Sequence, residues 1–393
     1  MTLISADDAA PVDQAIIDDA IAWRRRLHRA PELAFAETMT SEFVATLLEQ
    51  FGYSVHRGLG GTGVVGVLSR GTQKRSIAIR ADMDALPIEE RSGVEHESSI
   101  RGVMHACGHD GHTAIALAAA RACVSLQGLE GTLRFIFQPA EEGAGGARRM
   151  VDDGLFKLFP CDAIYSLHNQ PAIPFGSCVA RDGVMLSASG MFEVVISGKG
   201  CHGGRPHQGT DALLAACQLV SAFQSIVSRN IDPLQAAVLS VTQINAGDAF
   251  NVIPDHCVIR GTTRWLDEKS GDVLEQRFRE IASAIAKAFN CEAAIDYQRK
   301  FPATINDPGA ARLVRRAAGS VAGLSVLDHL PSTGSEDFSE MLKCVPGCYL
   351  WLGAGRSSED PGLHSPRYDF NDDLVRLGAD LWVAVVREHL CKA

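Results

Sequence analysis

The sequence predicts an α/β protein in which a small domain is inserted into a larger, layered domain. Short β-branched runs alternate with helical segments up to residue 186, as is typical of a layered α/β fold. Over residues 187–300 the pattern changes to β-α-β-β-α-β, and helices and strands alternate again from residue 301 onward. At 393 residues the chain is also long for one hydrophobic core. We therefore expect one domain from residues 1–186 and 301–393, and a second from residues 187–300.

The larger domain is expected to begin with two helices and to continue with strands around an Ala-rich helix. Thr40 or Ser41 is expected to cap the second helix. The near-continuous apolar character of residues 132–138 is typical of a strand in a sheet that is covered on both faces. The expected helices cover residues 16–30, 41–51, 113–126, 310–322 and 372–390. The expected strands cover residues 63–69, 76–81, 132–138, 163–168 and 349–352.

The inserted segment is expected to hold four strands and two helices. The strands cover residues 191–197, 236–246, 256–265 and 292–297, and the helices cover residues 211–228 and 270–289. This order is that of a ferredoxin-like sandwich. The predicted architecture is therefore a layered α/β domain with an inserted ferredoxin-like (βαββαβ) domain.

The bulk composition excludes several classes of partner. A net charge of −10 and a pI near 5.7 argue against nucleic acid or an anionic membrane surface as the main partner. No uninterrupted apolar run approaches the ~18 residues that a membrane span needs. The N-terminus lacks a basic stretch followed by an apolar one, so it is not expected to be a secretory signal. Eleven scattered cysteines, an odd number, indicate reduced thiols in a cytoplasmic protein.

Metal-binding side chains are concentrated in two short segments. Residues 104–112 contain Cys107 and His109, and the loop after the expected strand 132–138 contains Glu141 and Glu142. Thiolate, imidazole and carboxylate bind zinc-like divalent metals, and a spare carboxylate can accept a proton from a metal-bound water. A lone Cys-x-His is more often a packing thiol beside a surface ring, but three imidazoles within eight residues are hard to explain by packing. The combination predicts a metal-dependent hydrolase.

Two further histidines are candidate ligands. His168 ends an expected strand, and His364 lies in a loop before the last helix. Each fits a metal ligand and a structural histidine equally well. Six further histidines lie among no comparable set of ligand types and are expected outside the site: His28, His56, His96, His256, His329 and His389.

These motifs together resemble the M20 family of metallopeptidases, and in particular its amidohydrolase branch of hippurate hydrolases, N-acyl-amino-acid amidohydrolases and auxin-conjugate hydrolases. The similarity extends from about Trp23 to Leu390, in the same motif order, and includes an inserted lid and dimerisation domain. The motifs are Arg80-Ala-Asp-Met-Asp-Ala-Leu-Pro, Met104-His-Ala-Cys-Gly-His-Asp-Gly-His-Thr, Gln138-Pro-Ala-Glu-Glu-Gly, Asn251-Val-Ile-Pro-Asp, Gly334-Ser-Glu-Asp-Phe and His364-Ser-Pro.

The resemblance implies a centre with two divalent metal ions. Cys107 would be the bridging thiolate, Glu141 the general base, and Asp84 an aspartate that supports the metals. Asp82 stands where a histidine is usual in related enzymes, which leaves its role open. A thiolate bridge is compatible with zinc, cobalt, manganese or nickel. The remaining ligands would be His109, Glu142, His168 and His364.

The resemblance also implies functional residues in the inserted domain. His202 matches a lid histidine that reaches the active site of the partner subunit, although a solvated loop histidine is the alternative. The sequence departs from the usual lid motif at Cys201, at residues 203–204 and at Arg205, and from the commoner His-Val at Asn169. The candidates for binding the substrate carboxylate are Asn251 and Arg264, and Arg264 fits a surface position on a strand equally well.

The expected reaction is metal-dependent hydrolysis of the amide bond of an N-acyl amino acid, with an aroyl, acetyl or indole-acetyl group. The products are a carboxylic acid and a free amino acid, and the expected assembly is a homodimer through the lid domain or a higher oligomer. A dipeptidase or an aryl-amine hydrolase on the same site stays open. A catalytically inactive metal-binding protein is a further alternative, against which the retention of both Glu141 and Glu142 argues.

Overall fold

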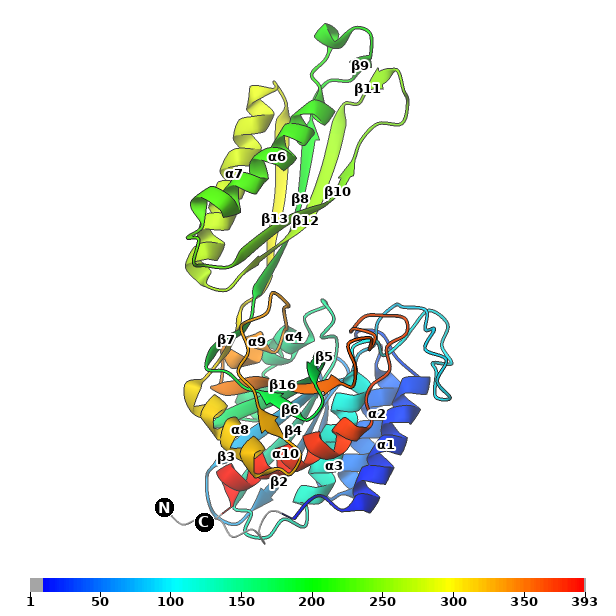
Figure 1. The fold of residues 1–393 in the computed structure, drawn as a ribbon, viewed down its shortest axis with the longest axis vertical. Coiled ribbons are helices and arrows are strands. Elements are labelled where there is room, and N and C mark those ends of the chain that lie inside the picture. The colour runs from blue at the N-terminus through cyan, green and yellow to red at the C-terminus, as the bar shows by residue number, and fades with distance from the viewer. Residues whose placement is uncertain (1–9, 392–393) are drawn as a thin grey trace. The chain divides into compact units, whose positions relative to one another are not determined.

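The computed structural model describes residues 10–391, which separate into two compact units (Figure 1). Unit 1 contains the chain up to Met185, Ile305–Leu330, and the chain from Asp337 onward. Unit 2 contains Leu186–Thr304 and the short segment Pro331–Glu336. The sequence-based division assigned residues 331–336 to the larger domain, whereas the structure places them in unit 2. The sequence of a short polar loop does not indicate which domain it joins.

Unit 1 is built on an eight-stranded mixed sheet with the strand order β1-β2-β4-β3-β5-β16-β6-β15. The central strands β4, β3, β5 and β16 pair in parallel. Strand β2 pairs antiparallel with β1 on one side and with β4 on the other. Every residue of β3 is buried, as expected for a parallel strand with both faces covered. The strands are β1 (Ser54–Leu59), β2 (Gly63–Arg70), β3 (Ser76–Asp82), β4 (Gly131–Gln138), β5 (Ala163–Pro174), β6 (Ser177–Val179), β15 (Ser325–Val326) and β16 (Gly347–Gly355).

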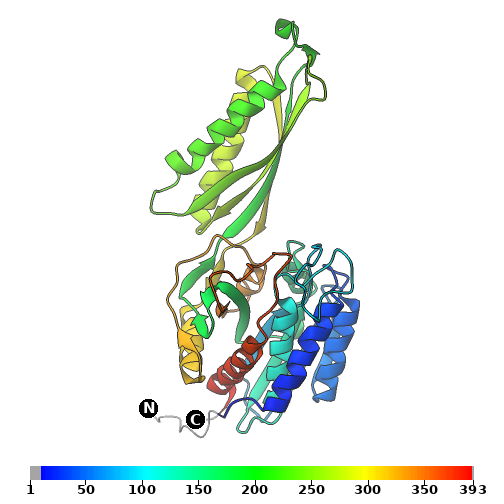
Figure 2. The same ribbon diagram turned by 45° about the vertical axis from the view of Figure 1, so that its right-hand side comes forward.

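Helices cover this sheet. The Ala-rich helix α3 packs against α1 and α10, and these helices form a layer with α2 beside the sheet (Figure 2). All of α3 except two residues near its end is buried, because small alanine side chains let its neighbours approach closely. The helices are α1 (Gln14–Arg29), α2 (Thr38–Gln50), α3 (His109–Cys123), α4 (Gly146–Asp152), α5 (Leu155–Leu158), α8 (Pro308–Ser320), α9 (Ser339–Leu342) and α10 (Asp373–Leu390).

The parallel strands bring the polar motifs to one edge of the sheet. Asp82, the last residue of β3, lies beside Gln138, the last residue of β4. Glu141 and Glu142 follow β4, and His168 lies on β5, where it pairs with β16. Ligand groups in α/β sheets gather at the carboxyl ends of parallel strands. The register of β3, β4 and β5 therefore determines where the site forms.

Two local expectations were wrong. Helix α2 begins at Thr38, and neither Thr40 nor Ser41 caps it. The carboxylate of Glu32 instead accepts the backbone N–H groups of Met39 and Thr40, at 3.0 and 2.8 Å, and so supplies the acceptor that a capping side chain would provide.

Helix α3 begins at His109 and not near residue 113, so His109 and His112 lie in its first turn and not in a loop. The N-cap residue Gly108 has a φ of 90°, a left-handed conformation that glycine adopts at little cost. A Cβ atom at this position would lie 2.5 Å from Asn169 Oδ1. The glycine therefore lets the chain turn sharply between Cys107 and His109.

Unit 2 is a four-stranded antiparallel sheet with two helices. The strand order is β10-β12-β8-β13 and the chain order is β8-α6-β10-β12-α7-β13, which is the topology of a ferredoxin-like sandwich. The rings of Phe223 and Phe278 stack at 4.2 Å between centroids in its core. The α/β fold class is thus confirmed. The elements are β8 (Ala188–Ser197), α6 (Ala212–Asn230), β10 (Ala237–Asn245), β12 (His256–Trp265), α7 (Glu268–Ala288) and β13 (Glu292–Phe301).

Two short pairs of strands complete the fold. β9 (Cys201–His202) pairs with β11 (Val252–Ile253) inside unit 2, and β7 (Gly183–Leu186) pairs with β14 (Thr304–Asn306) where the chain passes between the units. Helix α6 is long and apolar enough to cross a membrane by composition, with a mean hydropathy of 1.3. Core helices meet the same criterion, and one face of α6, from Ala212 to Ile226, is buried in the core of unit 2.

Candidate metal centre

The five predicted metal ligands lie together in unit 1. Cys107, His109 and His168 form one group of potential ligand atoms, and Cys107, Glu142 and His364 form another. Within each group the ligand atoms lie within 4.8 Å of one another. Cys107 is the member that both groups share. The thiol therefore lies close to potential ligand atoms of all four other residues.

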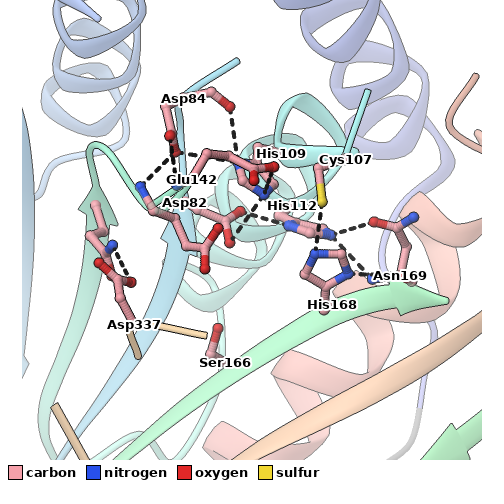
Figure 3. A network of polar contacts seen from close by, with 12 residues as sticks. Asp82, Asp84, Cys107, His109, His112, Glu142, Ser166, His168, Asn169 and Asp337 are labelled. Atoms are coloured by element: carbon pink, nitrogen blue, oxygen red, sulfur yellow. Dashed lines mark hydrogen bonds and ion pairs between the residues drawn. The ribbon is translucent and has the colours of Figure 1, made fainter. Parts of the chain in front are cut away.

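The thiol of Cys107 is buried, and its Sγ lies 3.3 Å from Nε2 of His168 (Figure 3). Burial raises the pKa of Cys107 well above its ordinary value, and the negative charge of Glu142 raises it further. A thiolate in this position therefore needs a cation to replace the thiol proton.

Backbone carbonyls set the tautomers of two histidines. Nδ1 of His109 lies 2.9 Å from the carbonyl oxygen of Asp84, and Nδ1 of His168 lies 2.7 Å from that of Asn169. A carbonyl accepts only, so each Nδ1 carries a proton and each Nε2 is left with a lone pair when the ring is neutral. Burial lowers the pKa of His168 well below its ordinary value, which keeps that ring neutral, as a metal ligand must be.

Glu142 and His364 complete the set. Nε2 of His364 lies 3.3 Å from Oε1 of Glu142, and the same oxygen lies 3.9 Å from Nε2 of His109. The hydrogen bond to Glu142 raises the pKa of His364. The backbone N–H of His364 donates to Ala106, next to Cys107 in the chain. His364 has a φ of 64°, an uncommon conformation for a non-glycine residue and one that recurs at functional sites.

The unsatisfied atoms of this cluster fit divalent metal ions. Nε2 of His109 is buried and has no hydrogen-bond partner within residues 10–391, and it lies 3.9 Å from Oε1 of Glu142. A buried polar atom without a partner costs ~1–3 kcal/mol, so an unpartnered imidazole nitrogen directed at a carboxylate oxygen fits a site for a cation. One thiol, three imidazoles and one carboxylate are donors that suit zinc and the neighbouring transition metals.

Asp84 supports the turn that carries the two glutamates. Its Oδ1 accepts the backbone N–H of Glu141 at 2.9 Å, and its Oδ2 accepts that of Glu142 at 3.0 Å. Oδ1 also lies 3.4 Å from Nδ1 of His109. The Glu141 side chain is nearly buried and forms a potential ligand group with His109 and Glu142. Asp84 thus links the base candidate to two of the predicted ligands.

Asp82, whose role the sequence left open, orients His112. Its Oδ1 lies 2.6 Å from Nδ1 of His112, and its Oδ2 accepts a hydrogen bond from Arg80 at 2.8 Å. Burial would raise the pKa of Asp82, but the cationic forms of His109 and His112 and the Arg80 guanidinium hold it well below its ordinary value. The second ring nitrogen of His112 lies 2.6 Å from Oδ1 of Asn169. Both ring nitrogens of His112 are therefore engaged by protein atoms.

Sequence reasoning assigned no role to several residues behind the ligands. Arg80 donates to Gln138 at 2.8 Å and to Asp337 at 3.2 Å, and thereby ties β3 to β4 and to the segment before α9. Asn169 donates to the hydroxyl of Tyr368 at 2.6 Å. A charged residue that directly follows the apolar residues 77–79 of a strand was a usable signal for Arg80. Asn169 and Tyr368 become neighbours only through the tertiary fold and gave no such signal.

The three predicted residues of the inserted domain lie in unit 2. His202 on β9 pairs with β11, next to Asn251, whose carbonyl accepts the N–H of Gly203 at 2.7 Å. The N–H of Gly204 donates to Nδ1 of His202 at 3.0 Å, so a neutral ring carries its proton on Nε2. Arg264 lies on β12, in the other sheet of the unit, and donates to the carbonyl of Thr263. Their distance from the five ligands depends on the orientation of the units, and their roles stay predictions.

Comparisons with known proteins place the chain in a family. Residues 78–388 match the Peptidase family M20/M25/M40. The chain is 40% identical over 375 residues to a hippurate hydrolase of Campylobacter jejuni, covering 93% of this chain and 95% of the relative. It is 39% identical over 371 residues to an N-acetyl-L-cysteine deacetylase of Bacillus subtilis, covering 94% and 88%. The YXEP protein of Bacillus subtilis, described as a dinuclear metal binding peptidase, has a similar crystal structure, with a TM-score of 0.83, 31% identity and coverage of 95% and 98%. The protein belongs to the Peptidase family M20/M25/M40.

Proposed function

We propose that the protein is a metal-dependent amidohydrolase that cleaves the amide bond of N-acyl amino acids and releases a carboxylic acid and a free amino acid. The observation that carries this proposal is a group of five potential ligands, of which Cys107, His109 and His168 are buried, with an additional carboxylate, Glu141, beside it. The relatives hippurate hydrolase and N-acetyl-L-cysteine deacetylase are named for substrates of this class. A metal site that serves only stability would not need the additional carboxylate.

The side chains divide the work between holding metals and moving a proton. Two divalent ions held by the five ligands would lower the pKa of a water molecule and polarise the amide carbonyl. Glu141 would accept a proton from the water that attacks the carbonyl carbon and would deliver it to the nitrogen of the leaving amine as the C–N bond breaks. Asp84 holds the backbone of Glu141 during both transfers, because it accepts the N–H group of that residue. The carbonyl partners of His109 and His168 keep their Nε2 lone pairs directed to the centre.

The inserted domain is proposed to supply the remaining contacts. The hydrogen bond from Gly204 leaves Nε2 of His202 as the donor, which suits the negative oxygen that develops on the attacked carbonyl. Asn251 and Arg264 are proposed to bind the carboxylate of the substrate. The two relatives named above differ in their acyl groups, benzoyl and acetyl, so the acyl preference of this protein stays open between aroyl, acetyl and indole-acetyl groups.

A substrate panel tests the proposed function. Protein stripped of metal with a chelator is reloaded with zinc, manganese, cobalt or nickel, and release of free amine is measured. The panel contains N-benzoyl, N-acetyl and indole-acetyl amino acids, dipeptides and aryl amides. We expect turnover of N-acyl amino acids that depends on added metal. Turnover of dipeptides or aryl amides alone would favour the alternative hydrolases, and no turnover with any metal would favour an inactive metal-binding protein.

We also propose a cytoplasmic homodimer assembled through unit 2. All eleven cysteines lie within the described residues and are free, as expected in a reducing compartment. Strand β10 is an edge of the four-stranded sheet, and the exposed edge carries backbone groups that could pair with a second copy. Cys217, Val220, Val241 and Ile244 line a shallow hollow of about 360 Å³ between this edge and α6. An apolar hollow beside an open strand edge favours association.

A mixed-dimer experiment tests this assembly and the role of His202 together. His202→Ala should keep its metals and lower kcat by ~10²–10³-fold, the cost of losing one oxyanion donor. Mixing it with Glu141→Gln should restore part of the activity, because one site of a mixed dimer then has both parental residues. The check is turnover in a preparation shown to contain mixed dimers. If such dimers stay inactive, His202 acts within its own subunit or not at all.

A further inference from the structure

The residue before the proposed base has an unusual backbone. Ala140 has a φ of 56°, in the left-handed region. This conformation costs a residue with a Cβ atom about 1–2 kcal/mol, and within residues 10–391 only three other non-glycine residues have a positive φ: Phe35, Asn290 and His364. Ala140 is fully buried, immediately before Glu141. The turn that presents the base is therefore strained, and other contacts must hold it.

Glu37 is the side chain that holds this turn from outside the metal centre. Its Oε1 accepts the backbone N–H of Ala140 at 2.9 Å, and its Oε2 accepts the hydroxyl of Thr62 at 2.6 Å. Glu37 is completely buried, although it precedes α2 and makes no capping bond to that helix. The carbonyl of Ala140 accepts the N–H of Gly146 at 3.0 Å. Burying a carboxylate costs free energy unless its oxygens are hydrogen-bonded. Here the amide of Ala140 and the hydroxyl of Thr62 supply those bonds.

Two carboxylates hold three consecutive amides of this turn. Glu37 accepts the N–H of Ala140, and Asp84 accepts those of Glu141 and Glu142. Hydrogen bonds to an ionised acceptor are roughly twice as strong as neutral ones. Asp84 follows β3 and contacts the ligand His109, whereas Glu37 lies before α2 and contacts no predicted ligand. The two carboxylates that bind the turn therefore come from different segments of the chain.

We propose that Glu37 is a positioning residue for the general base. By binding the amide of Ala140 it keeps that residue left-handed, and this conformation sets the direction in which Glu141 leaves the turn. The inference rests on the proposed function, in which Glu141 transfers the proton. Without an acceptor, the N–H of Ala140 is left buried and unsatisfied, and the chain gains by rotating toward an ordinary φ. A displacement of about 1 Å at a reacting group can lower the rate by ~10²-fold.

An isosteric pair of variants separates the hydrogen bond from packing. Glu37→Gln keeps an oxygen that can accept the Ala140 amide, and Glu37→Met keeps the volume without an acceptor. At saturating metal and substrate we expect Glu37→Gln to keep kcat within a few fold of the parent. Glu37→Met should lose ~10–100-fold in kcat, with KM and metal content close to those of the parent. Ala140→Gly in the Glu37→Met background should recover several-fold of this loss, because glycine adopts a positive φ at little cost.

A matched control lies five residues earlier. Glu32 also accepts backbone amides, those of Met39 and Thr40, but none from the turn at residue 140. Glu32→Met should therefore lower the melting temperature without changing kcat. Amide hydrogen exchange over residues 139–146 gives a readout that is independent of activity, and it should be faster in Glu37→Met than in Glu32→Met.

Several results would overturn the proposal. Equal kcat in Glu37→Met and Glu32→Met would do so, as would a loss of kcat in proportion to lost metal, which would assign Glu37 to support of the ligand Glu142. Failure of both Glu37→Met and its Ala140→Gly derivative to fold would make Glu37 a folding residue. A parent protein that hydrolyses nothing in the substrate panel refutes the proposed function instead, and the exchange comparison still decides whether Glu37 holds the turn.

Discussion

Two polar clusters lie around the first turn of α3, and both contain histidines and carboxylates. One is the candidate metal centre, to which His109 belongs. The other, the Arg24 cluster, is formed by Arg24, His28, Glu90, His96, Asp110, Asp369 and Asp372. Asp110 directly follows His109 in the chain, so adjacent residues of one helical turn belong to different clusters.

In the Arg24 cluster the protein supplies its own cations. Arg24 lies 3.0 Å from Asp369 and 2.8 Å from Asp372, and His28 lies 2.8 Å from Asp110. Burial would lower the pKa of His28, but Asp110 and Glu90 raise it to about 9. The imidazole is therefore a cation at neutral pH and compensates the buried carboxylates.

In the metal centre the neighbouring guanidinium does not face the ligand atoms. The guanidinium of Arg80 is engaged by Asp82, Gln138 and Asp337, and Nε2 of His109 has no hydrogen-bond partner in the described part of the chain. A buried cluster of histidines and carboxylates is thus structural where protein cations pair its charges. Such a cluster is a candidate metal site where several ligand atoms converge and the nearby guanidinium is engaged elsewhere.

The largest expected effect is that of Glu141→Gln, which removes the proposed base and leaves the five ligands. Turnover should fall by ~10²–10⁴-fold while metal content stays at the parental value. The contrasting variant Glu142→Gln should lose metal as well as turnover, because it removes a ligand. Elemental analysis and kcat at saturating metal check both variants. A Glu141→Gln enzyme with the parental rate would refute the assignment of the base.

Cys107→Ala should lower the number of metal ions bound per chain, since the shared thiolate is expected to hold both ions. Thiol reagents should inactivate the metal-free protein faster than the loaded protein, because a bound thiolate is a poorer nucleophile. Cys123→Ala is the matched control: this cysteine is the last residue of α3, the helix that begins two residues after Cys107, and it is buried in the hydrophobic core. It should lower stability and leave the metal content unchanged. Equal metal content in the Cys107 variant and the parent would exclude the ligand role.

The sequence predicted the parts of this arrangement that depend on local pattern. Long strands such as β3 and β12 follow from their β-branched runs, and the density of ligand types around Cys107 pointed to the metal centre. Two-residue strands such as β9 and β11 carry no measurable periodicity and were missed. The start of α2 was misplaced because its capping oxygen comes from Glu32 and not from Thr40 or Ser41.

The division between the two clusters could not be predicted from the sequence. His28 and His96 were expected outside the site, and the structure places them in the Arg24 cluster. That Asp110 belongs with them, although it lies between His109 and His112, depends on the direction in which each side chain leaves the helix. Partners such as Arg24 and Asp372 are more than 300 residues apart, so only the tertiary fold reveals their pairing.

Arg24→Leu tests whether the second cluster is structural. It leaves the buried carboxylate of Asp110 without its guanidinium and should lower the free energy of unfolding by about 3–5 kcal/mol. Arg25→Leu is the control, because Arg25 pairs with the same Asp372 at 2.8 Å but is 47% exposed, and its loss should cost ~0–1 kcal/mol. Denaturant unfolding measures both. If folded Arg24→Leu keeps the parental metal content, metal binding does not depend on the Arg24 cluster. If it loses metal, the two clusters are coupled.

The smallest expected effect is a change in how stability depends on pH. The pKa of His28 is about 9 in the folded protein, above the ordinary value of 6.5, so the folded state holds a proton that the unfolded state releases first. This stabilisation is complete below pH 6.5 and is lost as the pH rises through 9, with a slope of at most about 1.4 kcal/mol per pH unit. His28→Gln should remove that slope. His389, whose pKa burial lowers, is the control, since His389→Gln should alter the dependence only below pH 6.5. Urea unfolding of metal-loaded protein between pH 6 and about 10 measures the difference, and parallel curves for His28→Gln and the parent would mean that His28 is not a cation in the folded protein.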